Sequence, residues 1–152
     1  MAVLLRSEVR PSPVSLPQLK KTATALLRHA GKKQCELSIL LVDDRRMTAL
    51  NADFRGKNKP TNVLSFPMAG DDEWPGPPLL GDIVISLDTA AREAAAAGIP
   101  LVDHISVLLV HGLVHLLGHD HERGPEEAAV MAAMEKQLLR LLGTKNLAPL
   151  SG

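Results

Sequence analysis

The amino-acid sequence predicts a single α+β domain, in which a mixed sheet of about four strands is covered by about five helices. Short apolar runs alternate with segments of helical spacing in the first half of the chain, whereas predicted helices dominate the second half. The length of 152 residues is typical of one domain and is sufficient to bury a sizeable core. The sequence has no internal repeat and no linker, so residues 1–152 are expected to form one domain.

The first 42 residues are expected to contain two strands with a helix between them. A strand is predicted over residues 2–9, because two prolines follow this largely apolar run. Leucines and alanines at helical spacing predict a helix over residues 16–30, and Gly31 is suited to end it. The run CELSILLV predicts a strand over residues 35–42, whose apolar end is typical of burial on both faces.

The next segment is expected to place a polar loop between a helix and a short strand. Asp43 or Asp44 can cap a helix that runs to about Phe54. Residues 55–62 are polar and rich in turn-forming residues, so they predict a loop. A short strand is expected over residues 63–66, because a proline comes directly after it.

The second half of the chain is expected to hold one strand and then three helices. The acidic, proline-rich residues 68–79 predict a loop, and the alternating run GDIVISL predicts a strand over residues 81–87. Asp88 can cap an alanine-rich helix that ends near residue 98. Two more helices are expected over residues 100–117, opened by a proline, and 125–142, which lies between two glycines.

The composition excludes several classes of protein. An apolar fraction of 45% with 22% charged residues excludes a disordered chain. Cys35 is the only cysteine, which excludes a disulfide scaffold and fits a reducing compartment. The aromatic side chains are Phe54, Phe66 and Trp74, too few for platforms on which single-strand binders stack bases. The sequence has neither a membrane-length apolar run nor a signal-peptide pattern, so a cytoplasmic protein is expected.

The net charge of zero hides an uneven distribution of charge along the chain. Residues 1–60 hold 12 lysines and arginines against 5 acidic residues, whereas residues 61–152 hold 5 against 12. Such asymmetry is compatible with a basic face that holds phosphates. It is equally compatible with solvated helix surfaces whose charges mix in the folded chain, and the charge pattern alone does not separate the two.

A cluster of histidines predicts a zinc site on a zincin-like helix. Four of the six histidines lie in the run HGLVHLLGHDH, which begins at His111. His111 and His115 are four residues apart on a predicted helix, so both imidazoles project from one face. Gly118 can adopt the left-handed conformation that reverses the chain and brings His121 back to complete a tripod. Three nitrogen ligands leave a fourth position open, as in catalytic zinc sites.

The neighbours of this tripod have more than one possible role. His119 could replace His121 as a ligand or simply lie on the turn, and Asp120 could orient a histidine ring. An isolated histidine pair at this spacing is more often partly exposed, but this apolar helix would bury the imidazoles, which then need partners. His104 is expected to be a satisfied, buried residue and His29 a surface residue.

The spacing of the histidines is that of metzincin proteases, with one residue different. Those enzymes need a glutamate directly after the first histidine as a general base, and Gly112 occupies that position. A zinc peptidase that works by this mechanism is therefore disfavoured.

Three sequence blocks together resemble the YbeY family of bacterial rRNA-maturation endoribonucleases. They are FRGKNKPTNVLSFP at residues 54–67, LGDIVI at residues 80–85 and the histidine run at residues 111–121. Their order and separation match the family, and the resemblance spans nearly the whole chain. It implies a small α+β domain that hydrolyses phosphodiesters of single-stranded RNA, in the maturation of small-subunit (16S) rRNA and in ribosome quality control.

The resemblance also implies site residues and partners. By position, one zinc ion (Zn2+) per chain would be held by His111, His115 and His121, and Arg55 would join His111 as a catalytic residue. The implied partners are RNA of the small ribosomal subunit, a small-subunit ribosomal protein and an assembly GTPase, with no role for DNA or a membrane.

Residues near the arginine complete the expected site. Arg55 offers a planar fork suited to phosphate, and Lys57 and Lys59 can hold flanking phosphates by charge. Without the resemblance, a solvated polar loop would be the simpler interpretation of these three residues. The proton-transfer group is not identified. Ser65 is a candidate contact for the substrate or for a metal-bound water. Asp82 could act as an acid or base, but a strand-end hydrogen bond is the favoured interpretation.

Two other classes of function compete with the nuclease. One is a ribosome-assembly factor with a structural zinc, and the other is the zinc peptidase. A protein ligand at the fourth zinc position, such as His119, would close the site and favour the assembly factor.

Overall fold

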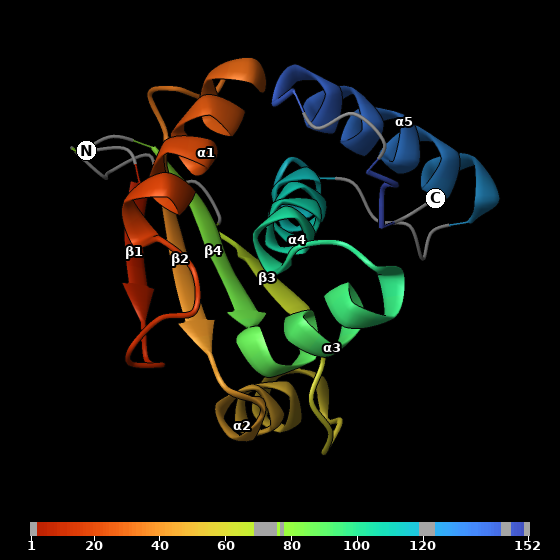
Figure 1. Ribbon diagram of the computed structural model, residues 1–152. Helices are drawn as coiled ribbons and strands as arrows, with labels where there is room; N and C mark the ends of the chain where they lie inside the picture. The colour runs from red at the N-terminus through yellow and green to blue at the C-terminus, as the bar shows by residue number, and fades with distance from the viewer. Residues whose placement is uncertain (1–2, 69–75, 77, 119–123, 144–146, 151–152) are drawn as a thin grey trace.

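A computed structural model describes residues 3–68, 76, 78–118, 124–143 and 147–150. Within these residues the chain forms the expected α+β domain, with four strands and five helices (Figure 1). The strands are β1 (Val3–Ser7), β2 (Glu36–Val42), β3 (Val63–Pro67) and β4 (Leu79–Ser86). The helices are α1 (Leu16–His29), α2 (Asp44–Arg55), α3 (Leu87–Ala97), α4 (Leu101–Leu116) and α5 (Pro125–Leu141).

The four strands form one mixed sheet in the order β1-β2-β4-β3. The first three in this order run parallel, and β3 pairs antiparallel with β4 at the edge of the sheet. Ile83 of β4 is central, because it pairs with Ile39 of β2 on one side and with Ser65 of β3 on the other. The parallel strands are joined through helices, as parallel pairing requires.

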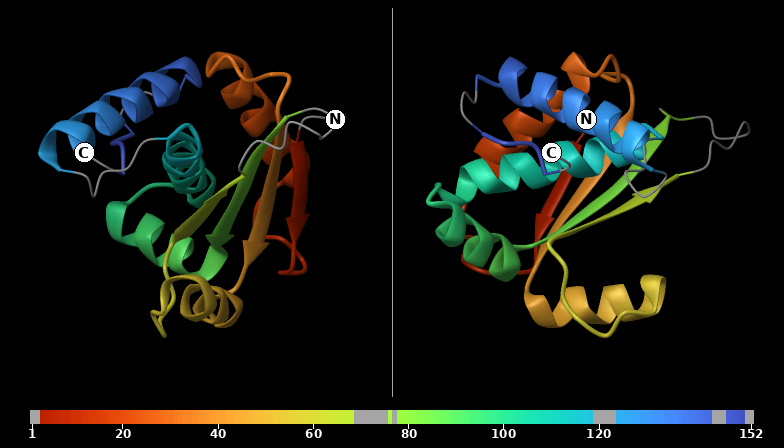
Figure 2. Two further views of the ribbon diagram at one scale, coloured as in Figure 1. Left: turned by 180° about the vertical axis from the view of Figure 1, so that it is seen from behind. Right: turned by 90° about the vertical axis from the view of Figure 1, so that its right-hand side faces the viewer.

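Helices cover the two faces of the sheet unequally. Helices α1 and α4 pack on one face and α5 packs on α4, whereas α2 lies on the opposite face (Figures 1 and 2). The larger apolar cluster lies between the sheet and the first group of helices. A smaller cluster lies under α2 and consists of Val42, Met47, Leu64 and Val84.

Helix α4 is the central helix of the larger core. Twelve of its 16 residues are buried, which explains why its sequence is apolar on almost every side. Among the described helices, none is by itself both long and apolar enough to cross a membrane. Helices α3 and α4 meet that length and composition only as a pair, and the pair is bent by 113°.

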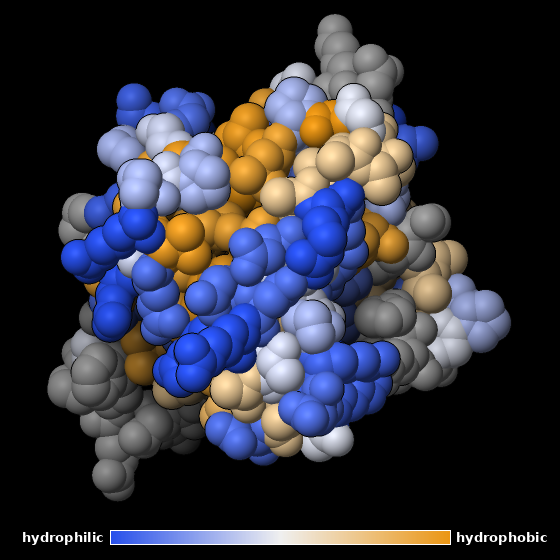
Figure 3. Space-filling view, turned by 60° about the horizontal axis from the view of Figure 1, so that its bottom comes forward, coloured by the Kyte–Doolittle hydropathy of each residue, from blue (hydrophilic) through white to orange (hydrophobic). Residues whose placement is uncertain are grey.

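The face that carries α2 is only partly covered. In the space-filling view from below, hydrophilic side chains form a band across the molecule, and an apolar area stays exposed beside it (Figure 3). Exposed large apolar side chains of the described residues include Leu4 and Phe54, which are 54% and 64% exposed.

Several predicted boundaries differ from the structure for local reasons. The first strand stops at Ser7 because the Ser7 hydroxyl bonds both the amide and the carbonyl of Val9, which starts a turn. The prediction that Asp88 caps the third helix is wrong. Ser86 is the cap and accepts a hydrogen bond from the Thr89 amide at 3.3 Å, so Leu87 already belongs to the helix.

Two further boundaries bear on the candidate site. The fourth strand begins two residues before the expected start, because Leu79 pairs with Glu36 of β2. The predicted break at Gly118 is confirmed, since α4 ends at Leu116 and Gly118 has a φ of +99°.

Candidate metal centre and basic groove

Helix α4 brings His111 and His115 together as their spacing predicts. Their Nε2 atoms are 3.1 Å apart, and the two rings meet edge to face with centroids 4.6 Å apart. Two nitrogens of a tetrahedral zinc site, each about 2.0–2.1 Å from the ion, lie about 3.3 Å apart. The separation of the two Nε2 atoms is therefore suited to sharing one metal ion.

A buried carboxylate stands behind this pair. The Nδ1 atom of His111 lies 3.2 Å from Oε1 of Glu135, a residue of α5 whose exposed fraction is zero. His111 itself is only 7% exposed. Metal-binding histidines usually donate their second ring nitrogen to a carboxylate or carbonyl, and this contact has that form.

The predicted third ligand lies outside the described residues. This applies to His121 and equally to His119 and Asp120. Within the described part of the chain, no three histidine, cysteine or acidic side chains are grouped closely enough to hold a metal ion. His111 and His115 are therefore the described part of the expected tripod.

Gly112 allows α4 to lie directly on the sheet. The Ser65 hydroxyl of β3 donates to the Gly112 carbonyl at 3.2 Å. A Cβ atom at Gly112 would lie 3.1 Å from Ser65 Oγ and 3.1 Å from Cγ2 of Ile83, closer than most real Cβ contacts. A side chain at the position where metzincin proteases carry their glutamate would therefore press on Ser65 and Ile83.

The three predicted phosphate contacts line one groove. It has a volume of about 340 Å3 and lies between α2, the loop after α2, and α3. Arg55, Lys57 and Lys59 are all exposed along it. Its other lining residues are Asn51, Pro60, Thr61, Asn62, Thr89 and Glu93.

Asn51 anchors the basic loop, which we define as residues 56–62 between α2 and β3. It is 1% exposed, and its Nδ2 donates to the Lys59 carbonyl at 2.8 Å. Its main-chain carbonyl accepts from the Lys57 amide at 3.3 Å. The main chain of both Lys57 and Lys59 is therefore hydrogen-bonded to Asn51. These bonds limit the conformations of the loop.

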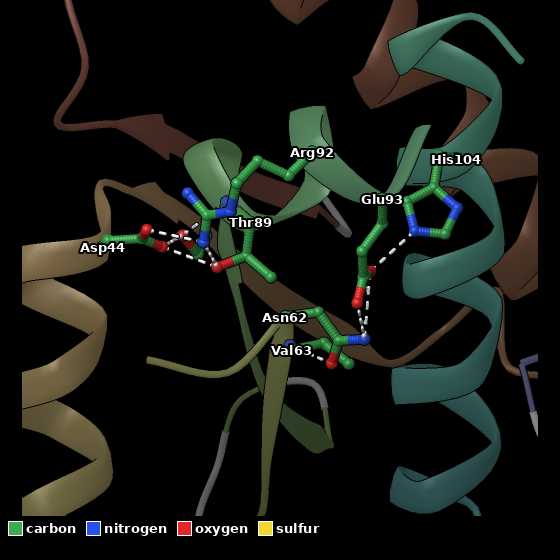
Figure 4. Close-up of polar contacts among 8 residues, drawn as sticks. Asp44, Asn62, Val63, Thr89, Arg92, Glu93 and His104 are labelled. Carbon is green, nitrogen blue, oxygen red and sulfur yellow. Dashed lines mark hydrogen bonds and ion pairs between the residues drawn. The ribbon is translucent and has the colours of Figure 1, made fainter. Parts of the chain in front are cut away.

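A second anchor ties the end of this loop to α3 and α4. Asn62 Nδ2 donates to both carboxylate oxygens of Glu93 at 3.2 and 3.3 Å, and Glu93 Oε1 lies 2.8 Å from His104 Nε2 (Figure 4). The Asn62 side-chain oxygen accepts from the Val63 amide at 2.7 Å, where β3 begins. His104 is 8% exposed, which confirms the expectation of a satisfied, buried histidine.

Asp44 joins the first turns of α2 and α3 beside the groove (Figure 4). Its Oδ1 accepts from the hydroxyls of Thr89 and Ser86 at 2.6 and 2.7 Å, and its Oδ2 pairs with Arg92 at 2.8 Å. Partial burial raises the pKa of Asp44, but these hydrogen bonds and the Arg92 charge outweigh it, so the pKa is below its ordinary value of 3.8. A further hydrogen bond joins the same two helices, because Asp88 Oδ2 of α3 accepts from the Asp44 amide at 2.9 Å.

The metal pair and the groove lie on different sides of strand β3. Ser65 faces α4 and contacts Gly112, whereas Phe66 faces α2 and meets Phe54 edge to face, with ring centroids 5.0 Å apart. Phe54 directly precedes Arg55 in α2. The edge strand is therefore the element that both parts of the candidate site share.

The structure also locates three other residues considered in the sequence analysis, His29, Asp82 and Ser65. His29 is exposed at the end of α1, as expected. Asp82 lies inside β4 rather than at its end and pairs with Ser38 and Phe66. The Ser65 hydroxyl is bonded to the backbone of α4, so its described role is to join strand and helix.

The sequence analysis did not identify the residues that hydrogen-bond to His111 and to the basic loop. Glu135 had a recognisable signal, because it shares the buried face of α5 with Met131, Leu138 and Leu139. A carboxylate at such a position needs a polar partner. Asn51, Asn62 and Glu93 had no comparable signal, since polar residues in loops and on helices are common.

Comparison with known proteins identifies close similarity along most of the chain. A family model described as Endoribonuclease YbeY matches residues 7–143. A protein of that description from Syntrophus aciditrophicus is 40% identical over 144 residues, covering 93% of this chain and 90% of the relative. Another from Anaeromyxobacter sp. is 48% identical, covering 94% of this chain and 73% of the relative.

A solved structure has the same fold. The solution structure of TM1509 from Thermotoga maritima matches with a TM-score of 0.65 and covers 92% of this chain and 88% of that chain. The sequence identity is 23%, so this likeness bears on the fold alone.

Proposed function

Because the chain belongs to the YbeY endoribonuclease family, we propose that it is a zinc-dependent hydrolase that cleaves single-stranded RNA. The observation that carries the proposal is the pair of Nε2 atoms of His111 and His115, which are 3.1 Å apart at the end of the central helix. The basic groove on the other side of β3 supports RNA as the substrate, because its three cations suit phosphate groups.

The proposed metal centre holds one zinc ion per chain. His111 and His115 supply two ligands, and His121 supplies the third by its position in the sequence. Zinc bound there supplies Lewis-acid activation of a phosphate or of a water molecule. A peptidase of the metzincin type is not supported, because Gly112 stands where its general base is required and packs closely against Ser65 and Ile83.

The chain's own residues are proposed to bind and orient the RNA. Arg55 presents a bidentate donor to a phosphate of the RNA bound along the groove and offsets its negative charge. Lys57 and Lys59 hold neighbouring phosphates. Asn51 and Asn62 fix the loop that carries these cations, which lowers the entropy lost when RNA binds.

The family resemblance extends the proposal to a cellular role. We propose that the enzyme acts in the cytoplasm on rRNA of the small ribosomal subunit, in 16S rRNA maturation and ribosome quality control. The proposed partners are a small-subunit ribosomal protein and an assembly GTPase.

The decisive experiment compares cleavage of an end-labelled single-stranded rRNA fragment by four proteins purified in parallel. Wild type is compared with Arg55→Ala, His115→Ala and, as a control, Lys21→Ala on the exposed surface of α1. Metal content is measured on each sample first.

Arg55→Ala is expected to keep its zinc and lose cleavage, because the arginine acts on the phosphate. His115→Ala is expected to lose both, and Lys21→Ala to keep both. Equal cleavage by all four proteins would contradict the proposal and identify a contaminating nuclease. If wild type holds a full zinc complement but cuts no RNA, free or in the ribosomal subunit, the non-catalytic assembly factor replaces the nuclease.

A further inference from the structure

We propose that Glu135 is a positioning residue of the metal centre, whose carboxylate fixes the ring of His111 so that Nε2 faces the metal position. The inference rests on the zinc site proposed above. It adds a residue from a different helix, 24 positions away in the chain from the histidine that it contacts.

The burial of Glu135 is the first argument. Its exposed fraction is zero, and it lies on the face of α5 that also buries Met131, Leu138 and Leu139. An apolar residue would serve this face better if packing were its only task, because burying a carboxylate is costly unless a polar group meets it. The His111 ring meets it, with Nδ1 3.2 Å from Oε1.

The chosen ring nitrogen is the second argument. A carboxylate accepts a hydrogen bond, so this contact selects the His111 tautomer that carries its proton on Nδ1. That tautomer leaves the lone pair on Nε2, the atom that lies 3.1 Å from Nε2 of His115. Glu135 therefore selects the ring form and orientation that a metal ligand requires.

A second histidine on the same helix shows the opposite arrangement. His104 lies two turns earlier on α4 and also pairs with a glutamate, Glu93 of α3. There the carboxylate engages Nε2, and the Glu93 side chain is 38% exposed. The two pairs have the same chemistry but different ring nitrogens, so Glu93 is a matched control for Glu135.

The test measures zinc affinity by competition with a chromogenic chelator, without any RNA. Wild type is compared with Glu135→Gln, Glu135→Ala and the control Glu93→Gln. Loss of such a carboxylate typically weakens metal binding about 10- to 100-fold. We expect Glu135→Ala to reach the upper part of this range and Glu135→Gln the lower part, because glutamine keeps an acceptor oxygen but no charge. Glu93→Gln is expected to keep the wild-type affinity.

A second readout separates positioning from general packing. In the metal-free protein, long-range proton–nitrogen spectra are expected to place the His111 proton on Nδ1 in wild type and to lose that preference in Glu135→Ala. If Glu135→Ala does not fold, Glu135→Gln decides, because an uncharged isostere is easier to bury. Affinity of Glu135→Gln within threefold of wild type would overturn the role of Glu135 alone. A wild-type protein that takes up no zinc would overturn the metal centre and this role together.

Discussion

Ser65 and Phe66 are neighbours on the edge strand, yet they contact elements on opposite faces of the sheet. The Ser65 hydroxyl donates to the carbonyl of Gly112 in α4, and the Phe66 ring packs on Phe54, next to Arg55. This alternation follows from the two-residue period of a strand. The edge strand therefore connects the helix of the histidine pair with the helix of Arg55 through two adjacent residues.

The close approach of Gly112 to the sheet predicts a packing cost. Replacing Gly112 with valine is expected to destabilise the fold by about 1–3 kcal/mol, because its Cβ would press on Ser65 and Ile83. Urea denaturation measures the change. Valine is a better helix former than glycine, so helix propensity alone predicts the opposite sign. A stabilised variant would show that α4 does not lie this close to the strands.

The Asp44 network predicts a loss of stability in acid. A carboxylate whose pKa is lower in the folded chain than in the unfolded chain stabilises the fold above its unfolded-state pKa. That contribution disappears as the pH falls through the folded-state pKa. The pKa of Asp44 is lowered by its bonds to Thr89, Ser86 and Arg92, which outweigh the effect of burial, so the loss is expected below about pH 3.8.

Asp44→Asn tests this acid dependence. The variant is expected to be less stable by about 1–3 kcal/mol at pH 7, and to converge with wild type at low pH. Urea titrations across the acid range provide the measurement. Asp53→Asn removes an exposed carboxylate from the same helix and controls for the loss of one charge. Parallel curves for wild type and Asp44→Asn would exclude the network as the cause.

The anchor under the basic loop predicts a change in proteolysis. Asn51→Ala removes the hydrogen bond to the Lys59 carbonyl, so the loop is expected to open more often. Limited trypsin digestion should cut faster after Arg55 and Lys57. The exposed Asn58, in the same loop, provides the matched control Asn58→Ala. Melting curves recorded alongside separate local opening from global unfolding, and unchanged cutting rates would disprove the anchoring role.

The groove predicts a change in the salt dependence of RNA affinity. Removing one lysine that neutralises a phosphate of single-stranded RNA lowers the slope of log affinity against log salt by about 0.7. The double substitution Lys57→Ala with Lys59→Ala is therefore expected to reduce the slope by about twice that amount. Binding of labelled single-stranded RNA is measured with a chelator present, which prevents cutting. An equal effect of Lys21→Ala on α1 would argue against a site in the groove.

The fold could be predicted because its signals are local. The helical spacing of α1 and α5, the apolar run of β2 and the turn-rich loop after α2 each depend on a few adjacent residues. Where an element boundary differs from its prediction, as at Ser7 and Ser86, a serine hydroxyl bonds a backbone amide two or three residues further along the chain. Such bonds compete with the regular backbone pattern and are not visible as periodicity.

The candidate site could be predicted only in part, for a different reason. His111 and His115 lie on one helix, so their proximity follows from helical geometry, and the structure confirms it. The contact of Glu135 with His111 depends on how α5 packs on α4, and the Glu93 contacts depend on where α3 meets the loop. A single sequence can mark Glu135 as a buried carboxylate that needs a polar partner, but it does not identify the residue on another helix that is the partner.

The nearly complete enclosure of α4 has a consequence for hydrogen exchange. A helix covered by strands and by other helices exchanges its amide hydrogens mainly when the whole domain opens, whereas an exposed loop exchanges by local opening. Amides near His111 are expected to be among the slowest in the chain, and those of residues 56–61 among the fastest. The proposed metal ligands His111 and His115 would then lie in the most slowly exchanging part of the fold. Local opening of the loop after α2 would leave that part undisturbed.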